Sequence, residues 1–203
     1  MRKEKKTELT KERIIKAALQ EFGTNGYDAT TLNSICSKHD IAKGLLYHNF
    51  KGKDEVYLTC VEECFNSLTD YLKCNIDIES SKSEDLLKAY LTARLSFFHS
   101  NPLFQRIFCD AVIFPPSHLQ EDIKKIKQDF DNLNTKVFST VITHLNLRSD
   151  VSEKEAIETF RQYQDFINAS YRLVGAQEID LESHEERCHR ALNILLYGII
   201  ERQ

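Results

Sequence analysis

The chain has 203 residues, of which 41% are hydrophobic and 29% charged, with only six glycines and three prolines. This composition is typical of a globular protein; it argues against a disordered chain and, because turn residues are scarce, against a many-stranded sheet. The net charge of −4 is unevenly distributed, since residues 1–57 carry 11 Lys or Arg against 8 Asp or Glu and the remainder carries 16 against 23. A basic N-terminal head on an acidic body suits a protein whose head meets a polyanion.

The two ends of the chain bear on its location. The charged opening MRKEKKTELTKER lacks an apolar stretch, and the longest apolar run, at about 191–200, is too short to span a bilayer. We therefore expect a cytoplasmic protein without a signal peptide or membrane contact. The six cysteines include no CxxC pair, so we interpret them as reduced and mostly buried thiols rather than as a disulfide framework.

Three short helices are predicted in the first 50 residues. The first covers about 11–24, with Thr10 as its N-cap and Gly26 just past its end. The basic residues that precede it are expected to form a disordered arm. The second helix covers about 31–38 behind a threonine cap, and the third covers about 42–48 after a bend.

The last two of these helices form a helix-turn-helix candidate. Residues 31–50 read TLNSICSKHDIAKGLLYHNF, with apolar residues spaced for burial and polar or basic residues between them. The second helix of the pair has only two turns and cannot bury much of itself, which suits a helix that enters a DNA groove. The residues that it leaves available are Lys43, Gly44, Leu45, Tyr47 and His48.

Helix signals continue to the end of the chain, and no alternating pattern interrupts them. A fourth helix begins near Lys53, and [ST]xx[EQ] capping patterns precede four later apolar segments. The predicted body helices cover about 83–100, 103–114, 117–147, 153–174 and 184–201. We therefore predict an all-α protein with a three-helix head and a larger helical body, about nine helices in all.

The residues of the head resemble a known family. The string ERIIKAALQEFGTNGYDATTLNSICSKHDIAKGLLYHNFKGKDEVYL is similar to the N-terminal domain of the TetR family of bacterial transcriptional regulators. The resemblance covers roughly the first 60 residues and implies an N-terminal helix-turn-helix domain at 1–57, with the motif at 31–50. It also implies a C-terminal ligand-binding and dimerisation domain at 58–203.

The resemblance assigns roles in binding double-stranded operator DNA. Thr31, Tyr47, His48 and Lys53 would contact phosphates, and Lys43 would face the major groove. Gly44 would allow close approach of the backbone to DNA, although a small residue where helices crowd is an equally simple interpretation.

Two positions in the third helix depart from the family pattern. Ala42 stands where a capping Ser or Thr is common, and Leu45 stands where a small polar residue is frequent. Leu45 would either meet a thymine methyl or pack inward, leaving Lys43 and Tyr47 to contact DNA. The operator sequence therefore cannot be deduced.

The acidic body is rich in aromatic residues, and the resemblance implies that its helices enclose a pocket for a small apolar or aromatic effector. Aromatic residues at helical spacing are also typical of plain core. The candidate ligand residues are Tyr90, Arg94, Phe97, Phe98, Phe104, Phe108, Asp110, Phe130, Tyr163 and Phe166.

The last two predicted helices carry more apolar surface than one chain can cover. A homodimer that pairs them in a four-helix bundle would cover it, and this is also what the resemblance implies. The candidate interface residues are Phe160, Ala191, Leu192, Leu195, Leu196 and Ile199.

Other kinds of site have little support in the sequence. Cys60 with Cys64, and His184 with Cys188, are each four residues apart, but no third ligand completes a metal site, so neither metal nor cofactor is expected. No catalytic motif is present, and we do not expect an enzyme.

The sequence predicts a ligand-responsive transcriptional regulator, a repressor rather than an activator. The alternative is a helical ligand-binding or protein-interaction module without sequence-specific DNA binding.

Overall fold

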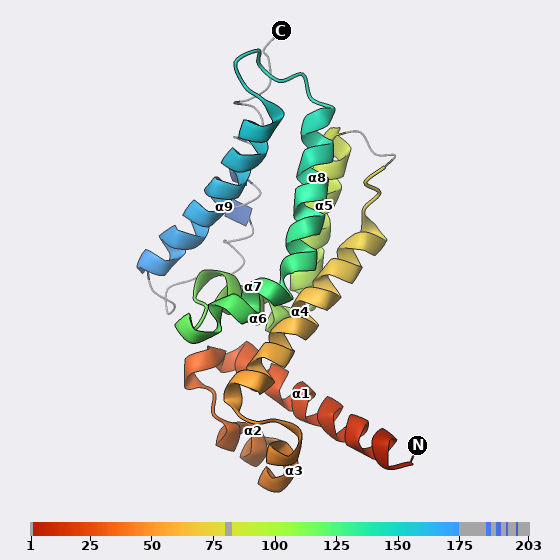
Figure 1. Cartoon of the computed structure of the whole chain (residues 1–203), viewed down its shortest axis with the longest axis vertical. Coiled ribbons are helices and arrows are strands. Elements are labelled where there is room, and N and C mark those ends of the chain that lie inside the picture. The colour runs from red at the N-terminus through yellow and green to blue at the C-terminus, as the bar shows by residue number, and fades with distance from the viewer. Residues whose placement is uncertain are drawn as a thin grey trace. The chain divides into compact units, whose positions relative to one another are not determined.

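The computed structural model describes residues 2–79 and 83–174, together with six single positions between 186 and 198. Nine α-helices and one short 3-10 helix make up most of the described part (Figure 1). They pack into two compact units, the first formed by Met1–Asn66 with Asn101–Lys127 and the second by Ser67–Ser100 with 128–203. The prediction of an all-α fold is confirmed.

The first unit contains the predicted head. Its helices are α1 (Arg2–Ala29), α2 (Leu32–Lys38), α3 (Lys43–Asn49), the first half of α4 (Lys53–Asn75), α6 (Pro102–Ile113), the 3-10 helix η1 (Ser117–Leu119) and α7 (Gln120–Ile126). The second and third predicted helices and the start of the fourth are observed within one residue of their expected positions.

The first helix is longer than predicted. It begins at Arg2 rather than near Lys11, so the expected disordered arm is wrong: Arg2, Lys3, Lys5 and Lys6 belong to the first turns of α1. Lys and Glu dominate this segment, and both have high helix propensity. The expected end is close to the observed break, because Gly26 has φ 77° and ψ 176° inside the helix.

Helix α2 begins with a reciprocal cap. The backbone N–H of Ser34 donates to the hydroxyl of Thr31 over 3.0 Å, and the N–H of Thr31 donates to the hydroxyl of Ser34 over 3.1 Å. Helix α3 lacks such a cap, since Ala42 at its N-cap makes no side-chain hydrogen bond. The absence of a side-chain cap at Ala42, which the sequence indicated, is therefore observed in the structure.

Polar side chains of α1 hold the bend between α2 and α3. Arg13 donates to the carbonyl of Asp40 over 2.7 Å and to that of His39 over 3.3 Å, and Asp40 has a left-handed φ of 51°. The buried carboxylate of Glu21 accepts a hydrogen bond from Lys38 at 2.8 Å and lies 3.5 Å from Nε2 of His39. These contacts fix the helix-turn-helix on α1.

Helices α1 and α6 approach closely. A Cβ at Gly23 would lie 2.7 Å from the Cβ of Leu103 and 2.9 Å from its Cα. Beyond Gly26 the backbone N–H of Tyr27 donates to Asp110 over 3.3 Å, and Asp110 pairs with Arg106 over 3.0 Å. Residues 101–127 thus pack with the first 66 residues. The expected functional division at residue 57 stays a prediction, since packing units and functional domains need not coincide.

The second unit contains α5 (Ser83–Ser100), α8 (Gln128–Thr143) and α9 (Glu153–Val174), with α8 packed against both α5 and α9.

The prediction of a single helix over 117–147 is wrong. The chain forms η1, α7 and α8 there, because Lys127, with φ −81° and ψ 2°, interrupts the α-helical conformation. The predicted helix at 184–201 falls almost wholly outside the described residues. No helix of the described ranges is long and apolar enough to cross a membrane.

We expect Gly23→Ala to lower the free energy of unfolding by about 1 to 3 kcal/mol, because the added methyl overpacks the contact with the backbone of α6. Gly44→Ala is the matched control: it has no atom within 4 Å of the added Cβ, and the higher helix propensity of Ala leaves stability equal or higher. Urea unfolding followed by circular dichroism measures both. A Gly23→Ala protein as stable as wild type would contradict the close packing.

Glu21 makes a pH-dependent contribution to stability. Burial raises its pKa, but the hydrogen bond and charge of Lys38, with hydrogen bonds from His39 and Ser34, outweigh burial and lower the pKa below its usual value. A lowered folded pKa stabilises the protein above the unfolded value of about 4.3, and the contribution is lost as the pH falls through the folded value.

We therefore expect Glu21→Gln to lower the free energy of unfolding by about 1 to 3 kcal/mol at neutral pH. The difference from wild type shrinks as the pH falls below about 4.5. Urea titrations across that range measure it, with Glu12→Gln, an exposed carboxylate of the same helix, as the control. A difference that is constant with pH would show that ionisation of Glu21 is not what stabilises the bend.

Candidate nucleic-acid interface

One face of α3 carries the residues that the sequence singled out for DNA. Lys43, Gly44, Tyr47 and His48 are all exposed, with Tyr47 at 59%, whereas Leu46 is fully buried and anchors the helix to the head. The helix therefore presents a basic and aromatic surface without losing its hold on the core. The structure brings these predicted residues together.

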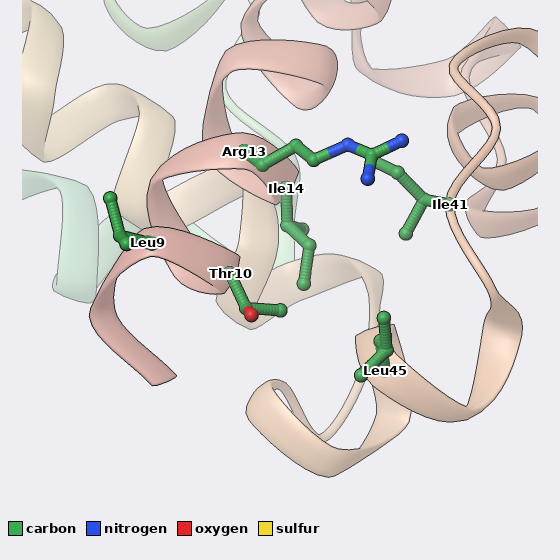
Figure 2. Close-up of a pocket in the computed structure, with 6 residues that line it drawn as sticks. All are labelled: Leu9, Thr10, Arg13, Ile14, Ile41 and Leu45. Atoms are coloured by element: carbon green, nitrogen blue, oxygen red, sulfur yellow. The ribbon is translucent and has the colours of Figure 1, made fainter. Parts of the chain in front are cut away.

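Leu45 lies beside this face rather than on it. It is 45% exposed and, with Ile41 and four residues of α1, lines an open hollow of about 150 Å³ (Figure 2). Figure 2 shows Leu9, Thr10, Arg13 and Ile14 on α1 across the hollow from Leu45. Leu45 is thus not packed fully inward, and whether it contacts a base stays a prediction.

Thr31 and Lys53 flank α3 along the chain. The hydroxyl oxygen of Thr31 accepts the capping hydrogen bond from Ser34, which leaves its O–H able to donate from an exposed position. Lys53, the first residue of α4, is half-buried. Its ammonium lies 4.1 Å from the ring centroid of Tyr27 and 3.4 Å from the carbonyl oxygen of Asp28. Lys53 is therefore held by neighbouring groups rather than extended into solvent.

Tyr27 is the centre of a polar and aromatic cluster that the sequence did not indicate. Its hydroxyl donates to Oδ1 of Asp54 over 2.5 Å, and Nε2 of His118 lies 3.1 Å from Oδ2 of the same carboxylate. Nε2 of His118 also lies 3.4 Å from the hydroxyl oxygen of Tyr27. Burial, together with the hydrogen bond to Asp54, raises the pKa of Tyr27, so the phenol is neutral and donates. No local signal could have found this cluster, because His118 is 91 residues from Tyr27.

Seven of the ten predicted effector residues lie in the second unit, and five of these are buried: Tyr90, Arg94, Phe97, Phe98 and Phe130. The guanidinium of Arg94 donates to the hydroxyl of Tyr90 over 3.1 Å and lies 5.5 Å from the ring centroid of Phe130. Tyr90 in turn donates to Asn134. Tyr90 and Phe130 thus lie around the buried guanidinium of Arg94, whereas Phe97 and Phe98 contact each other, with ring centroids 5.4 Å apart.

The other five predicted effector residues are not part of this buried group. Phe104, Phe108 and Asp110 belong to α6 in the first unit. There Asp110 is engaged by Arg106 and Tyr27, and burial raises its pKa, although the charge of Arg106 opposes the shift. On α9, Tyr163 is half-buried and Phe166 is 66% exposed. The structure therefore does not bring the ten candidates into one cluster.

The predicted dimer residues are only partly described. Phe160 is buried against Phe138 of its own chain, with ring centroids 5.7 Å apart, and Ala191 is buried as well. Leu192, Leu195, Leu196 and Ile199 lie outside the described residues.

Four of the five described cysteines are buried, as core residues are, and Cys74 is exposed. Cys60 and Cys64 are fully buried, burial raises the pKa of both thiols, and Cys64 donates to the carbonyl oxygen of Phe104 over 3.4 Å. Within the described ranges, no three His, Cys, Asp or Glu side chains gather as metal ligands do.

Comparison with known proteins gives a family for the head. Residues 14–60 match the model of the bacterial regulatory proteins of the tetR family. The biofilm operon icaADBC HTH-type negative transcriptional regulator IcaR of Staphylococcus epidermidis is 42% identical over 67 residues, 33% of this chain and 36% of that protein. The uncharacterized HTH-type transcriptional regulator YerO of Bacillus subtilis is 29% identical over 126 residues, 61% of this chain and 43% of that protein. The chain thus spans less than half the length of these relatives.

Solved structures match over nearly the whole chain. The transcriptional regulator FadR from Bacillus subtilis, in complex with stearoyl-CoA, has a TM-score of 0.67 at 18% identity, covering 93% of this chain and 98% of that one. SmeT, the repressor of the Stenotrophomonas maltophilia multidrug efflux pump SmeDEF, has a TM-score of 0.64 at 17% identity, covering 94% and 90%. Such likeness establishes a shared fold. The family match itself covers residues 14–60, the part of the chain that contains the helix-turn-helix.

Proposed function

We propose that the protein is a ligand-responsive transcriptional regulator that binds operator DNA through α3 and acts as a repressor. The observation that carries the proposal is the exposed face of α3, where Lys43, Tyr47 and His48 project from a helix that is anchored by a single buried leucine. A short exposed helix with this chemistry fits a DNA major groove. The name of the S. epidermidis relative, a negative transcriptional regulator, supports repression.

Phosphate contacts supply the main attraction in this proposal. Tyr47 and His48 on α3, Thr31 before α2 and Lys53 on α4 can each donate a hydrogen bond to a phosphate oxygen. The base contacts are left to Lys43, with Gly44 allowing close approach and Leu45 offering an apolar contact to a thymine methyl. The protein acts by binding rather than by catalysis, and it needs no cofactor.

A homodimer would present two α3 helices to one duplex. Two successive major grooves on one side of B-DNA are about 34 to 36 Å apart, so a two-fold dimer requires a palindromic operator. We propose that α9 and the segment after it form the dimer bundle. An effector that favours another spacing of the two heads would release the DNA.

The proposed effector is small and apolar or aromatic. The buried cluster of Tyr90, Arg94 and Phe130 supports this choice, because its rings offer apolar contact and its guanidinium suits an anionic group. Among proteins of the same fold, one is described in complex with stearoyl-CoA, and another represses a multidrug efflux pump.

Selection from a random duplex pool tests the central proposal. We expect the full-length protein to enrich a palindromic sequence and to bind it with strong salt dependence. The alternative, a helical ligand-binding or protein-interaction module, is favoured by no structural observation. It would be supported if no sequence is enriched and no duplex is retained at low salt.

We expect Tyr47→Ala and Lys53→Ala each to weaken binding to the selected duplex. Lys53→Ala should also make the log–log salt slope shallower by about 0.9, because it removes a cation that neutralises one phosphate, whereas the hydroxyl of Tyr47 supplies a hydrogen bond and no cation. Lys73→Ala is the matched control, since Lys73 is an exposed lysine in the last turn of α4. A Lys53→Ala slope equal to that of wild type, or a Tyr47→Ala affinity equal to that of wild type, would contradict the assigned roles.

Stearoyl-CoA is a direct probe of the proposed effector class. If the second unit binds it, we expect a higher Tm, corresponding to about 2.7 kcal/mol at a ligand concentration a hundredfold above Kd, and weaker binding to the selected duplex. Coenzyme A alone controls for the nucleotide. A Tm and a DNA affinity that both stay constant would exclude long-chain acyl-CoA as the effector.

A further inference from the structure

The cluster around Tyr27 bears directly on one of the proposed phosphate contacts. Lys53 opens α4, and its ammonium lies over the ring of Tyr27 at 4.1 Å. The ring of Tyr27 is itself fixed by aromatic neighbours, with centroids 4.7 Å from Tyr57 and 6.3 Å from Phe22. A cation over a fixed aromatic face has a preferred position, whereas a lysine in solvent samples many rotamers.

The hydroxyl end of Tyr27 is fixed as well. The carboxylate of Asp54 can only accept hydrogen bonds, so the O–H of Tyr27 and the Nε2–H of His118 both donate to it, one to each oxygen. This geometry requires the tautomer of His118 that carries its proton on Nε2. Asp54 follows Lys53 directly in α4, and the carboxylate therefore joins α4 to both Tyr27 and His118.

His118 comes from a different part of the chain. It lies in η1, which follows Pro115 and Pro116, and its ring centroid is 6.2 Å from that of Tyr27. Proline at the N-cap of η1 restricts the backbone there, so the position of the imidazole is defined by the chain as well as by its hydrogen bond. His118, which lies outside residues 1–57, thus completes the cluster that holds Lys53.

We propose that Tyr27, Asp54 and His118 are positioning residues for DNA binding: they hold the ammonium of Lys53 in place for its phosphate contact. This inference rests on the proposed function, because it assigns Lys53 to a phosphate. It adds that the contact depends on a side chain of η1, so that a displacement of η1 would weaken DNA binding without altering α3.

A double-mutant cycle tests the dependence. His118 is half-exposed, so His118→Ala should leave the protein folded and weaken binding to the selected duplex by about two- to fivefold. In a Lys53→Ala background the same substitution should have no effect, whereas in a Tyr47→Ala background its effect should be undiminished. His118→Gln, which keeps a neutral N–H donor, should restore binding, and His144→Ala, at an exposed histidine of the second unit, is the control.

A second measurement follows the NMR signal of Lys53 in the absence of DNA. Reductive ¹³C-methylation of the full chain gives one signal for each lysine, and the ring of Tyr27 should shift the Lys53 signal upfield. Tyr27→Phe, Asp54→Asn and His118→Ala should each move that signal, and Lys53→Arg, which removes it, provides the assignment.

The two measurements separate the possible failures. An equal effect of His118→Ala in the Lys53→Ala background, or a Lys53 signal that is the same in all three variants, would overturn the positioning role while leaving the proposed function intact. Absence of DNA binding by the wild type would overturn the proposed function and, with it, the phosphate role of Lys53.

Discussion

A seven-residue helix such as α3 is not stable on its own, so its position depends on what holds it. Helix α1 holds α3 in position through contacts with the bend and with α2. Arg13 binds the carbonyl oxygens of the bend that precedes α3, and the buried carboxylate of Glu21 binds the end of α2 through Lys38. Leu46 supplies the apolar anchor of α3 itself. The exposed residues of α3, which we propose to contact DNA, are therefore not needed to hold the helix in place, because Leu46 and the contacts with α1 do so.

The cluster around Tyr27 extends this arrangement to the start of α4. Asp54 and His118 fix the phenol, and the phenol ring underlies Lys53. In both places a side chain of α1 holds a lysine: the carboxylate of Glu21 holds Lys38, and the ring of Tyr27 holds Lys53. This is how a functional surface made of flexible lysines can keep a defined geometry.

Sequence reasoning succeeded where the signals are local. The threonine cap of α2 and the missing side-chain cap at Ala42 depend on neighbours within one turn, and the structure has both as predicted, with Thr31 as the capping threonine. The prediction was wrong at the start of α1. The charged residues there were expected to be disordered, but they belong to the helix, and Lys and Glu have high helix propensity. The sequence also placed Asp110 in an effector pocket. In the structure Asp110 contacts Tyr27 and Arg106, and the contact with Tyr27 exists only because α6 packs on α1. Residue types alone do not determine such long-range pairings.

The glycine at position 23 has a consequence for how this head can be joined to other proteins. Because α6 lies against it more closely than any side chain allows, a head cut from the chain after α4 would lose the surface on which its first helix rests. A chimaera that joins this head to a foreign body would place an unrelated helix over Gly23 and beside Tyr27. The exchangeable module is therefore discontinuous: it consists of residues 1–66 together with 101–127, and both pieces must be transferred for the helix-turn-helix to keep its support.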